Sequence, residues 1–234
     1  MAARRIALAG FGLAATICFL ALGWWQVERR TWKLDLIERV DARIHAAAVP
    51  LPPPGQWPSI NERGDAYRKV RVDGVFQHEC ETPVQALTER GAGYWLLTPL
   101  RTADGVVLVN RGFVPSERDN PGVREAGRIA GPVTVTGLMR MTEPKGTLLR
   151  SNDPAAGRWF SRDAEAILRK CGIDGARTFF IDADATPNPG GYPVGGLTVI
   201  AFSNSHFVYA VTWFTLALMS MAGIVLLFRK ERVR

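Results

Sequence analysis

The sequence predicts a membrane-anchored α+β protein: a two-helix transmembrane hairpin plus an extracytoplasmic, mainly antiparallel β domain (sheet or partly closed barrel) with a few helices. Two segments without any formally charged residue, 6–27 and 207–228, lie near the two ends of the chain. The region between them consists mostly of short apolar runs separated by turn residues, which is typical of strands. Basic residues gather outside the apolar segments.

Each apolar segment is slightly longer than the about 20 helical residues that cross a hydrocarbon core about 30 Å thick. A cleaved signal peptide is the alternative for the first segment, which begins with Arg4 and Arg5. Its apolar stretch exceeds the about 7–15 residues of a signal peptide, and it ends in Gly-Trp-Trp-Gln at 23–26, which is no small-residue cleavage site. We therefore expect the first segment to remain as a transmembrane helix.

The charges that flank the second segment predict its orientation. Its C-terminal side is strongly basic, whereas residues 203–206 before it contain no Lys or Arg. The positive-inside rule then places both tails, 1–5 and 229–234, in the cytoplasm, and residues 28–206 in the periplasm of a bacterial inner membrane. Arg29, Arg30 and Lys33 oppose this orientation, but long domains cross membranes largely regardless of charge.

The formal net charge of +7 comes mostly from the two tails. The region between the spans has no basic stripe with interleaved aromatic residues, so we expect a lipid bilayer and no nucleic acid as a partner. The basic residues of the tails are Arg4, Arg5, Arg229, Lys230, Arg232 and Arg234.

Residues 31–46 have apolar side chains every fourth position, beginning at Trp32, and charged side chains elsewhere. This pattern predicts an amphipathic helix after the first span, and the prolines between 50 and 58 predict a stiff connector after it. We predict a helix that Ser161 caps and that ends before Gly172. The predicted strands are 67–77 with a break at Gly74, 93–100, 106–114, 133–141, 177–184 and 197–202.

The three cysteines do not form a Cys-x-x-Cys motif, which excludes a thioredoxin-like or c-type haem attachment site. Cys18 lies inside the first span. Cys80 and Cys171 could pair in an oxidising compartment, but nothing in their spacing requires it, and we expect two unrelated thiols.

Motifs of hydrolases, nucleotide-binding proteins and zinc proteases are missing from the sequence, so we expect no enzyme and no catalytic residues. His45 and His78 are expected to be ordinary surface residues. The triplet at 78–80, His-Glu-Cys, is a poor metal site, because adjacent residues of a strand alternate between its faces.

His206 stands at the outer membrane entrance of the second span, a position where histidines are uncommon and often functional. On a helix, Tyr209 and Trp213 would share its face. The plainer interpretation is an interfacial aromatic belt with a solvated histidine. The alternative is a haem site with His206 on the iron, in which aromatic residues and propionate-binding arginines come from the end of the first span: Trp24, Trp25, Arg29 and Arg30.

At these residues the chain resembles the Surfeit locus family of cytochrome c oxidase assembly proteins. Residues 22–26, Leu-Gly-Trp-Trp-Gln, with Arg29, Trp32 and Lys33, are similar to one family signature. The run Leu-Val-Asn-Arg-Gly-Phe-Val-Pro at 108–115 resembles its most recognisable internal motif. Further similar blocks are Tyr67–Val70 with Gly74, Asn152–Pro154 with Trp159 and Asp163, and Pro193, Gly195–Thr198, Asn204, His206 and Tyr209–Phe214.

The resemblance covers residues 22–214 and implies two spans around an extracytoplasmic domain, together with a role in inserting haem a into oxidase subunit I. It implies that His206 is the ligand of the haem iron, that oxidase subunit I is a partner, and that haem a synthase is a possible second partner. Ser205 replaces an asparagine that the family usually has, which can alter local hydrogen bonding.

The main alternative is a cofactor-free membrane chaperone that stabilises nascent oxidase subunit I. Its contact surface would include the turn Asn110-Arg111-Gly112. A structural role for this turn is favoured, with Gly112 in a bulge and Arg111 in a buried ion pair, because glycine within a strand often marks a bulge.

Overall fold

A computed structural model describes residues 2–147, 149–175, 178–200 and 202–229 of the chain. The chain forms two units. The helical unit contains the described residues up to Arg39 and those from Ile200 onward, and the β unit runs from Val40 to Val199. The predicted domain at 28–206 encloses the β unit.

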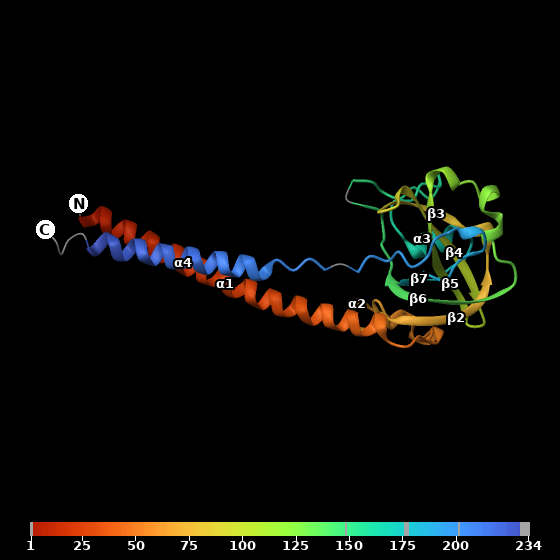
Figure 1. The fold of residues 1–234 in the computed structure, drawn as a ribbon, viewed down its shortest axis with the longest axis horizontal. Helices are drawn as coiled ribbons and strands as arrows, with labels where there is room; N and C mark the ends of the chain where they lie inside the picture. Colours follow the sequence, from red (N-terminus) through yellow and green to blue (C-terminus); the bar gives the residue numbers. More distant parts are fainter. Residues whose placement is uncertain (1, 148, 176–177, 201, 230–234) are drawn as a thin grey trace. The chain divides into compact units, whose positions relative to one another are not determined.

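The helical unit consists of α1 (Ala2–His45), whose last residues already belong to the β unit, and α4 (His206–Arg229). The two helices run side by side and antiparallel within the unit (Figure 1). Both are long and apolar enough to cross a membrane. The predicted helix at 31–46 is no separate element: α1 continues through it, since residues 24–45 contain neither glycine nor proline.

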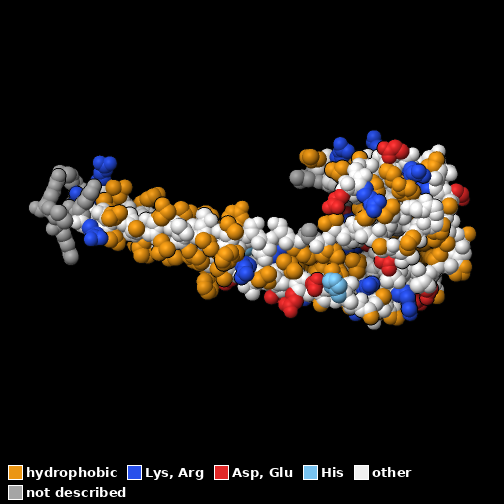
Figure 2. All heavy atoms as spheres, viewed as in Figure 1, with side chains coloured by type: hydrophobic (Ala, Val, Ile, Leu, Met, Phe, Trp, Pro, Cys, Tyr) orange, Lys and Arg blue, Asp and Glu red, His pale blue; other side chains and the backbone are white. Residues whose placement is uncertain are grey.

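The contact between α1 and α4 is a heptad seam, in which positions alternate by three and four residues on each helix. Phe19 and Trp213 stack across it with 5.7 Å between ring centroids, and the Ser220 hydroxyl donates to the Gly12 carbonyl at 2.9 Å. Small residues let the backbones approach, as in membrane helix pairs. Large hydrophobic side chains cover the outer faces (Figure 2). The small seam residues are Gly12, Thr16, Gly23, Ala210, Ala217 and Ser220.

The described residues of the β unit form one sheet of seven strands in the order β1-β2-β6-β7-β5-β4-β3, and a further pairing of β2 with β4 closes five of them into a barrel. Five pairings are antiparallel, and two are parallel, β1 with β2 and β5 with β7. The structure thus confirms the partly closed barrel. The strands are β1 (Val49–Pro50), β2 (Lys69–Phe76), β3 (Thr82–Thr88), β4 (Gly91–Thr102), β5 (Gly105–Pro115), β6 (Pro132–Met141) and β7 (Phe179–Ala183).

Short helices join the strands. Two are α-helices, α2 (Glu62–Asp65) and α3 (Ala164–Lys170). The others are single 3₁₀ turns or pairs of them: η1 (Pro54–Ser59), η2 (His78–Cys80), η3 (Ser116–Arg118), η4 (Pro121–Gly127) and η5 (Pro189–Gly191).

Alternating side chains of the strands divide the core of the β unit into two clusters. Val109 of β5 and Ile181 of β7 belong to the barrel interior with Val70 and Met139, whereas their neighbours Leu108 and Phe180 face α3. There they pack on Trp159, Ile167 and Leu168. Burying each such side chain contributes about 1.5–3 kcal/mol to folding.

The predicted strands at 67–77, 93–100, 106–114 and 133–141 correspond to β2, β4, β5 and β6. Of the prediction at 177–184, residue 177 lies outside the described residues, and the strand occupies Phe179–Ala183. The edge strands β1 and β3 were not predicted.

Two other predictions were wrong. Asp163 rather than Ser161 caps α3, because the Ser161 hydroxyl donates to the Glu143 carbonyl at 2.6 Å. Residues 197–200 form no strand; Thr198 is tied by its side chain to Asp182 instead. The rest of that predicted strand includes residue 201, which is outside the described part of the chain.

Candidate functional site

His206, the first residue of α4, pairs with Gln26 of α1 across the seam of the helical unit. Its Nδ1 lies 2.7 Å from the amide oxygen Oε1 of Gln26. An amide oxygen only accepts hydrogen bonds, so in the neutral ring this contact assigns the proton to Nδ1 and leaves Nε2 with its lone pair. A histidine held in this way presents Nε2 as a metal ligand, with the Gln26 oxygen as the outer partner that fixes the ring.

The predicted aromatic surroundings of His206 are formed only in part. Trp213 lies on the seam and stacks on Phe19. Tyr209, three residues after His206 on α4, lies on the same side of the helix but is 54% exposed. The seam passes through Ala210 instead, four residues after His206. Trp24 and Trp25 are 63% and 53% exposed and also point away from the seam.

The predicted arginines have different surroundings. The Arg30 guanidinium lies 5.5 Å from the ring centroid of Phe207, the residue after His206. Arg29 stays with its own helix, 4.2 Å from the centroid of Trp32. His206 and Trp213 thus lie on the seam and Arg30 lies beside Phe207, whereas Trp24, Trp25 and Tyr209 are exposed and Arg29 contacts Trp32. Binding of a haem by any of them remains a prediction.

Gln26 is the residue that the search for site residues missed. The sequence spacing could have identified it. Gln26 follows Gly23 by three positions and Phe19 by seven, so it lies on the same face of α1 as these seam residues. A polar residue on an otherwise apolar or small-residue seam indicates a partner on the facing helix.

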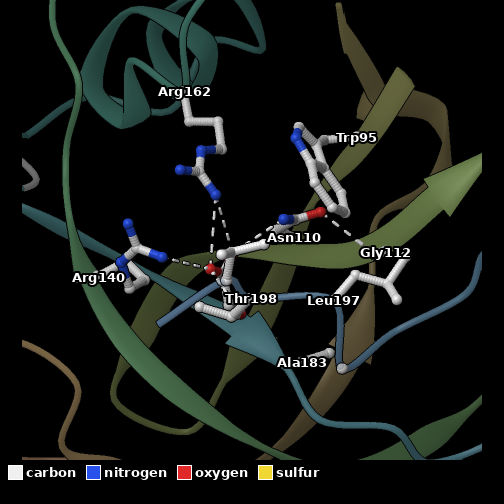
Figure 3. A pocket seen from close by; sticks show the side chains of 11 residues that line it. Trp95, Asn110, Gly112, Arg140, Arg162, Ala183, Leu197 and Thr198 are labelled. Carbon is white, nitrogen blue, oxygen red and sulfur yellow. Dashed lines mark hydrogen bonds and ion pairs between the residues drawn. The ribbon is translucent and has the colours of Figure 1, made fainter. Parts of the chain in front are cut away.

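A second polar site lies in the β unit, around a cavity of about 170 Å³ beside Asp182 (Figure 3). Asp182 is only 3% exposed, and donors from several segments converge on its carboxylate. The donors are Asn110 Nδ2 at 2.8 Å, Thr198 Oγ1 at 3.0 Å, Arg140 Nη1 at 3.1 Å and Arg162 Nη1 at 3.4 Å. The carboxylate thus ties β5, β6 and the 194–199 segment to β7.

The charges around this cavity compensate one another. Arg162 also pairs with Glu143, through Nε and Oε2 at 3.1 Å and through a shorter contact from Nη2 to Oε1. Burial disfavours the charged forms of both Glu143 and Arg162. The hydrogen bonds and the attraction between the two opposite charges outweigh this effect, so the pKa of Glu143 is lowered and the pKa of Arg162 is raised. Two guanidinium groups and two carboxylates form a neutral cluster, which favours a structural role.

A third polar cluster surrounds the Asn110-Arg111-Gly112 turn. Arg111 is 2% exposed and donates to Glu81 Oε2 at 3.2 Å and to the Gly127 carbonyl. Arg124, also buried, forms a short ion pair with Oε1 of the same carboxylate. Trp95 of β4 pairs with Phe113 of β5, and Leu97 pairs with Asn110. Between these pairs Arg111 and Gly112 of β5 lie opposite Leu96 of β4, which is a β-bulge. The predicted bulge and buried pair are confirmed.

His78 belongs to this cluster, so the prediction of an ordinary surface residue was wrong. Its Nε2 lies 2.9 Å from the Ile129 carbonyl and donates to it, while Nδ1 lies 3.5 Å from Arg111 Nη1. Burial, followed by the nearby positive charge of Arg111, lowers the pKa of His78. His45, by contrast, lies on the exposed face of α1, as predicted.

The fold and the helical site define a class of protein: a small closed β-barrel whose chain enters and leaves through two candidate membrane helices that share a histidine–glutamine pair. The model of the SURF1 family matches residues 13–218, and the chain belongs to this family. Surfeit locus protein 1 of Homo sapiens is 38% identical over 93% of this chain and 75% of its own length. The rat (Rattus norvegicus) protein of the same name is 36% identical over 89% of this chain and 71% of its own length, and a SURF1-like protein of Monosiga brevicollis is 32% identical over 93% and 86%.

Proposed function

We propose that this protein is an assembly factor for a haem-copper terminal oxidase, which binds haem a and hands it to oxidase subunit I. Membership of the SURF1 family and the similarity of the two terminal motifs support the oxidase role. We propose the bacterial inner membrane as its location, with both termini in the cytoplasm and the β unit in the periplasm, on the basis of the basic C-terminal tail. The protein would act by binding and transfer, without catalytic turnover.

The observation that carries the haem proposal is the His206–Gln26 pair. Both ring nitrogens of His78 are engaged by the cluster around Arg111, and His45 lies on the exposed face of α1. His45 also bonds through Nδ1, to the Asp41 carbonyl at 2.9 Å, but it is exposed and belongs to the β unit. Among the described histidines, His206 is the one whose Nδ1 is held by a facing helix and whose Nε2 has no hydrogen-bond partner. An imidazole nitrogen in this state suits an axial bond to haem iron.

The residues around His206 have separate roles in this proposal. His206 would hold the iron through Nε2, and Gln26 would keep the ring in place. Arg30 would pair with a propionate, and Arg29 is a second candidate for that contact. Trp213 would give an apolar wall, whereas Trp24, Trp25 and Tyr209, which are exposed on the helices, would contact the macrocycle only from outside the seam. Bound haem supplies the electron-transfer centre that the oxidase later uses.

Transfer requires an exchangeable bond to the carrier. A single histidine from a two-helix seam satisfies this requirement better than two axial ligands, because only one bond has to break. Haem a synthase would act as the donor and oxidase subunit I as the acceptor.

The test is the visible spectrum of the detergent-solubilised protein, purified from cells that make haem a, in the oxidised and reduced states. We expect stoichiometric haem a in the parent protein and in a His45→Ala control, and loss of the haem band in His206→Ala with unchanged circular dichroism. Retained haem with an unchanged spectrum in His206→Ala would exclude His206 as the ligand.

A colourless parent protein that still co-purifies with oxidase subunit I would instead support the cofactor-free chaperone. In that case the contact surface must lie elsewhere than the 110–112 turn. Arg111 and Asn110 are both buried in the β unit and cannot reach a partner.

A further inference from the structure

Two cysteines that are 91 positions apart in the sequence meet in the β unit. Cys80 ends η2 and Cys171 is the C-cap of α3. The Cys171 thiol lies 3.7 Å from the Cys80 carbonyl oxygen, toward which its S–H points. Both are free thiols, as expected, but they lie next to each other in the β unit.

We propose that Cys80 and Cys171 are a disulfide-forming pair that fastens η2 to the C-terminal end of α3. Both residues are free thiols here and both are half-buried, so a small oxidant has partial access to them. The Cys171 sulfur lies 3.7 Å from the backbone carbonyl oxygen of Cys80, and this contact places the two residues side by side. A disulfide then requires the side chains to turn so that the two sulfurs meet. The inference concerns the β unit alone and does not depend on haem binding.

Both partners are held in place by the fold. Cys80 precedes Glu81, whose carboxylate is fixed by Arg111 and Arg124 inside the third polar cluster. The Cys171 backbone N–H donates to the Leu168 carbonyl at 3.0 Å and thereby closes the last turn of α3. Because neither segment has to move far, the bond would form without rearranging the core.

The chemistry favours oxidation over metal binding. Burial, together with the neighbouring Cys80 thiol, raises the pKa of Cys171 to about 12, so this sulfur stays protonated at neutral pH. Metal ligation requires thiolates, and a protonated thiol is a poor ligand. In thiol–disulfide exchange, a thiolate needs to form only transiently, and the reaction accelerates as the pH rises.

The exchange balances with an external disulfide as the oxidant. One protein thiolate attacks a sulfur of the oxidant, forms a mixed disulfide and releases one thiol. The second protein thiolate attacks the mixed disulfide at the protein sulfur and releases the other thiol. The protein loses two protons and two electrons, which reduce the oxidant to two thiols. In the cell, the oxidant would be a protein dithiol oxidase or a low-molecular-weight disulfide of an extracytoplasmic compartment.

The bond would close a loop that contains β3, β4, β5, β6 and α3, which is most of the β unit. Closing a long loop restricts the unfolded chain more than closing a short one does. We therefore expect the disulfide to stabilise the β unit and, through Cys80, to hold Glu81 in its buried cluster.

The test uses the full chain in detergent, reduced or treated with oxidised glutathione, then blocked with N-ethylmaleimide at low pH and digested with trypsin without reductant. We expect one linked product of peptides 72–90 and 171–177, about 2 Da lighter than the sum of the free peptides and separable by reduction. Oxidation should also raise Tm by several degrees. Cys18→Ser, which keeps the pair, should behave like the parent chain, and Cys171→Ser and Cys80→Ser should lose both effects.

Two results would overturn the proposal. One is that, after oxidation of the Cys18→Ser protein, which still contains Cys80 and Cys171, each of the two peptides carries N-ethylmaleimide or glutathione and no linked product forms. The other is that disulfides form only through Cys18 between two chains of the parent protein. Neither outcome affects the haem proposal, because that proposal is tested separately by the visible haem spectrum of the parent protein and of His206→Ala.

Discussion

The Nδ1 atom of His206 lies 2.7 Å from Oε1 of Gln26, although 180 positions separate the two residues in the chain. This hydrogen bond assigns the tautomer of the imidazole and fixes the plane of its ring. It also joins the first residue of α4 to α1 across a seam that otherwise consists of small and aromatic residues.

Replacing Gln26 with Leu should remove the acceptor and leave the His206 ring free to rotate. If His206 holds haem as proposed, the affinity for haem a should fall by about 10–100-fold, as for other outer partners of ligating histidines. Titration of the haem-free protein followed by absorbance measures this change. Gln26→Glu keeps an acceptor and should retain most of the affinity, and Val27→Leu on the exposed side of α1 is the control. Equal affinities of Gln26→Leu and the parent protein would contradict the role of Gln26.

Replacing Glu81 with Gln should destabilise the β unit strongly, because Arg111 and Arg124 then remain buried without a carboxylate. Breaking a buried ion pair from one side costs about 3–5 kcal/mol. Urea unfolding followed by the fluorescence of the tryptophans measures this loss. The matched control is Glu125→Gln, which removes an exposed partner of Arg128 and should change the free energy of unfolding by less than about 1 kcal/mol. Equal effects of the two substitutions would refute the buried cluster.

Replacing Gly112 with Ala should disrupt the bulge in β5. Gly112 has φ of +130°, and a β-carbon there would lie 2.2 Å from the Val194 carbonyl oxygen. The unfavourable φ together with the collision should cost at least about 2 kcal/mol. Gly91→Ala is a suitable comparison, since Gly91 has φ of +98° but nothing within 4 Å of its added β-carbon. It should cost only the conformational term of about 1–2 kcal/mol. A Gly112→Ala protein as stable as Gly91→Ala would argue against the close approach of Val194.

The stability of the β unit should depend on pH through His78. Burial lowers the pKa of His78 below the ordinary value of 6.5, so the unfolded chain binds the proton more readily than the folded chain does. The contribution of His78 is therefore fully present above pH 6.5 and declines as the pH falls below it.

Replacement of His78 by Gln keeps one donor for Ile129 and one acceptor for Arg111 but cannot titrate. We expect the Gln variant to lose less stability than the parent between pH 6.5 and 5, measured by urea unfolding at each pH. The exposed His45→Gln control should follow the parent. Identical pH profiles for the parent and His78→Gln would show that the histidine is not buried in solution.

Much of the fold could be predicted from the sequence, because its signals are local. Charge-free segments predicted both long helices, and alternating apolar residues predicted β2, β4, β5 and β6. The edge strand β3 was missed because it contains Pro83 and Gln85 and lacks a run of apolar residues. Barrel closure through Val75–Arg101 and Phe76–Leu100 joins distant residues and leaves no local pattern.

The candidate site shows the same division between local and distant information. His206 was found because a histidine at the entrance of an apolar helix is conspicuous. The face on which it lies depends on the partner helix: a heptad seam has 3.5 residues per turn and leads from His206 to Ala210, not to Tyr209. The pairing of Cys171 with Cys80 and of Arg111 with Glu81 required the tertiary fold, because no spacing in the sequence encodes it.

Among the described strands, closure of the barrel leaves two sheet edges, and both are unsuited to accept another strand. The outer strand β1 has two residues, one of them Pro50, which lacks a backbone donor. On the other side β3 contains Pro83, and its Gln85 N–H is already used by the Trp159 carbonyl at 2.9 Å. The sheet thus resists edge-to-edge aggregation, and recognition of a client by strand addition is disfavoured. If the proposed client is an oxidase subunit, side chains and loops would bind it, and they can release it again without separating a shared sheet.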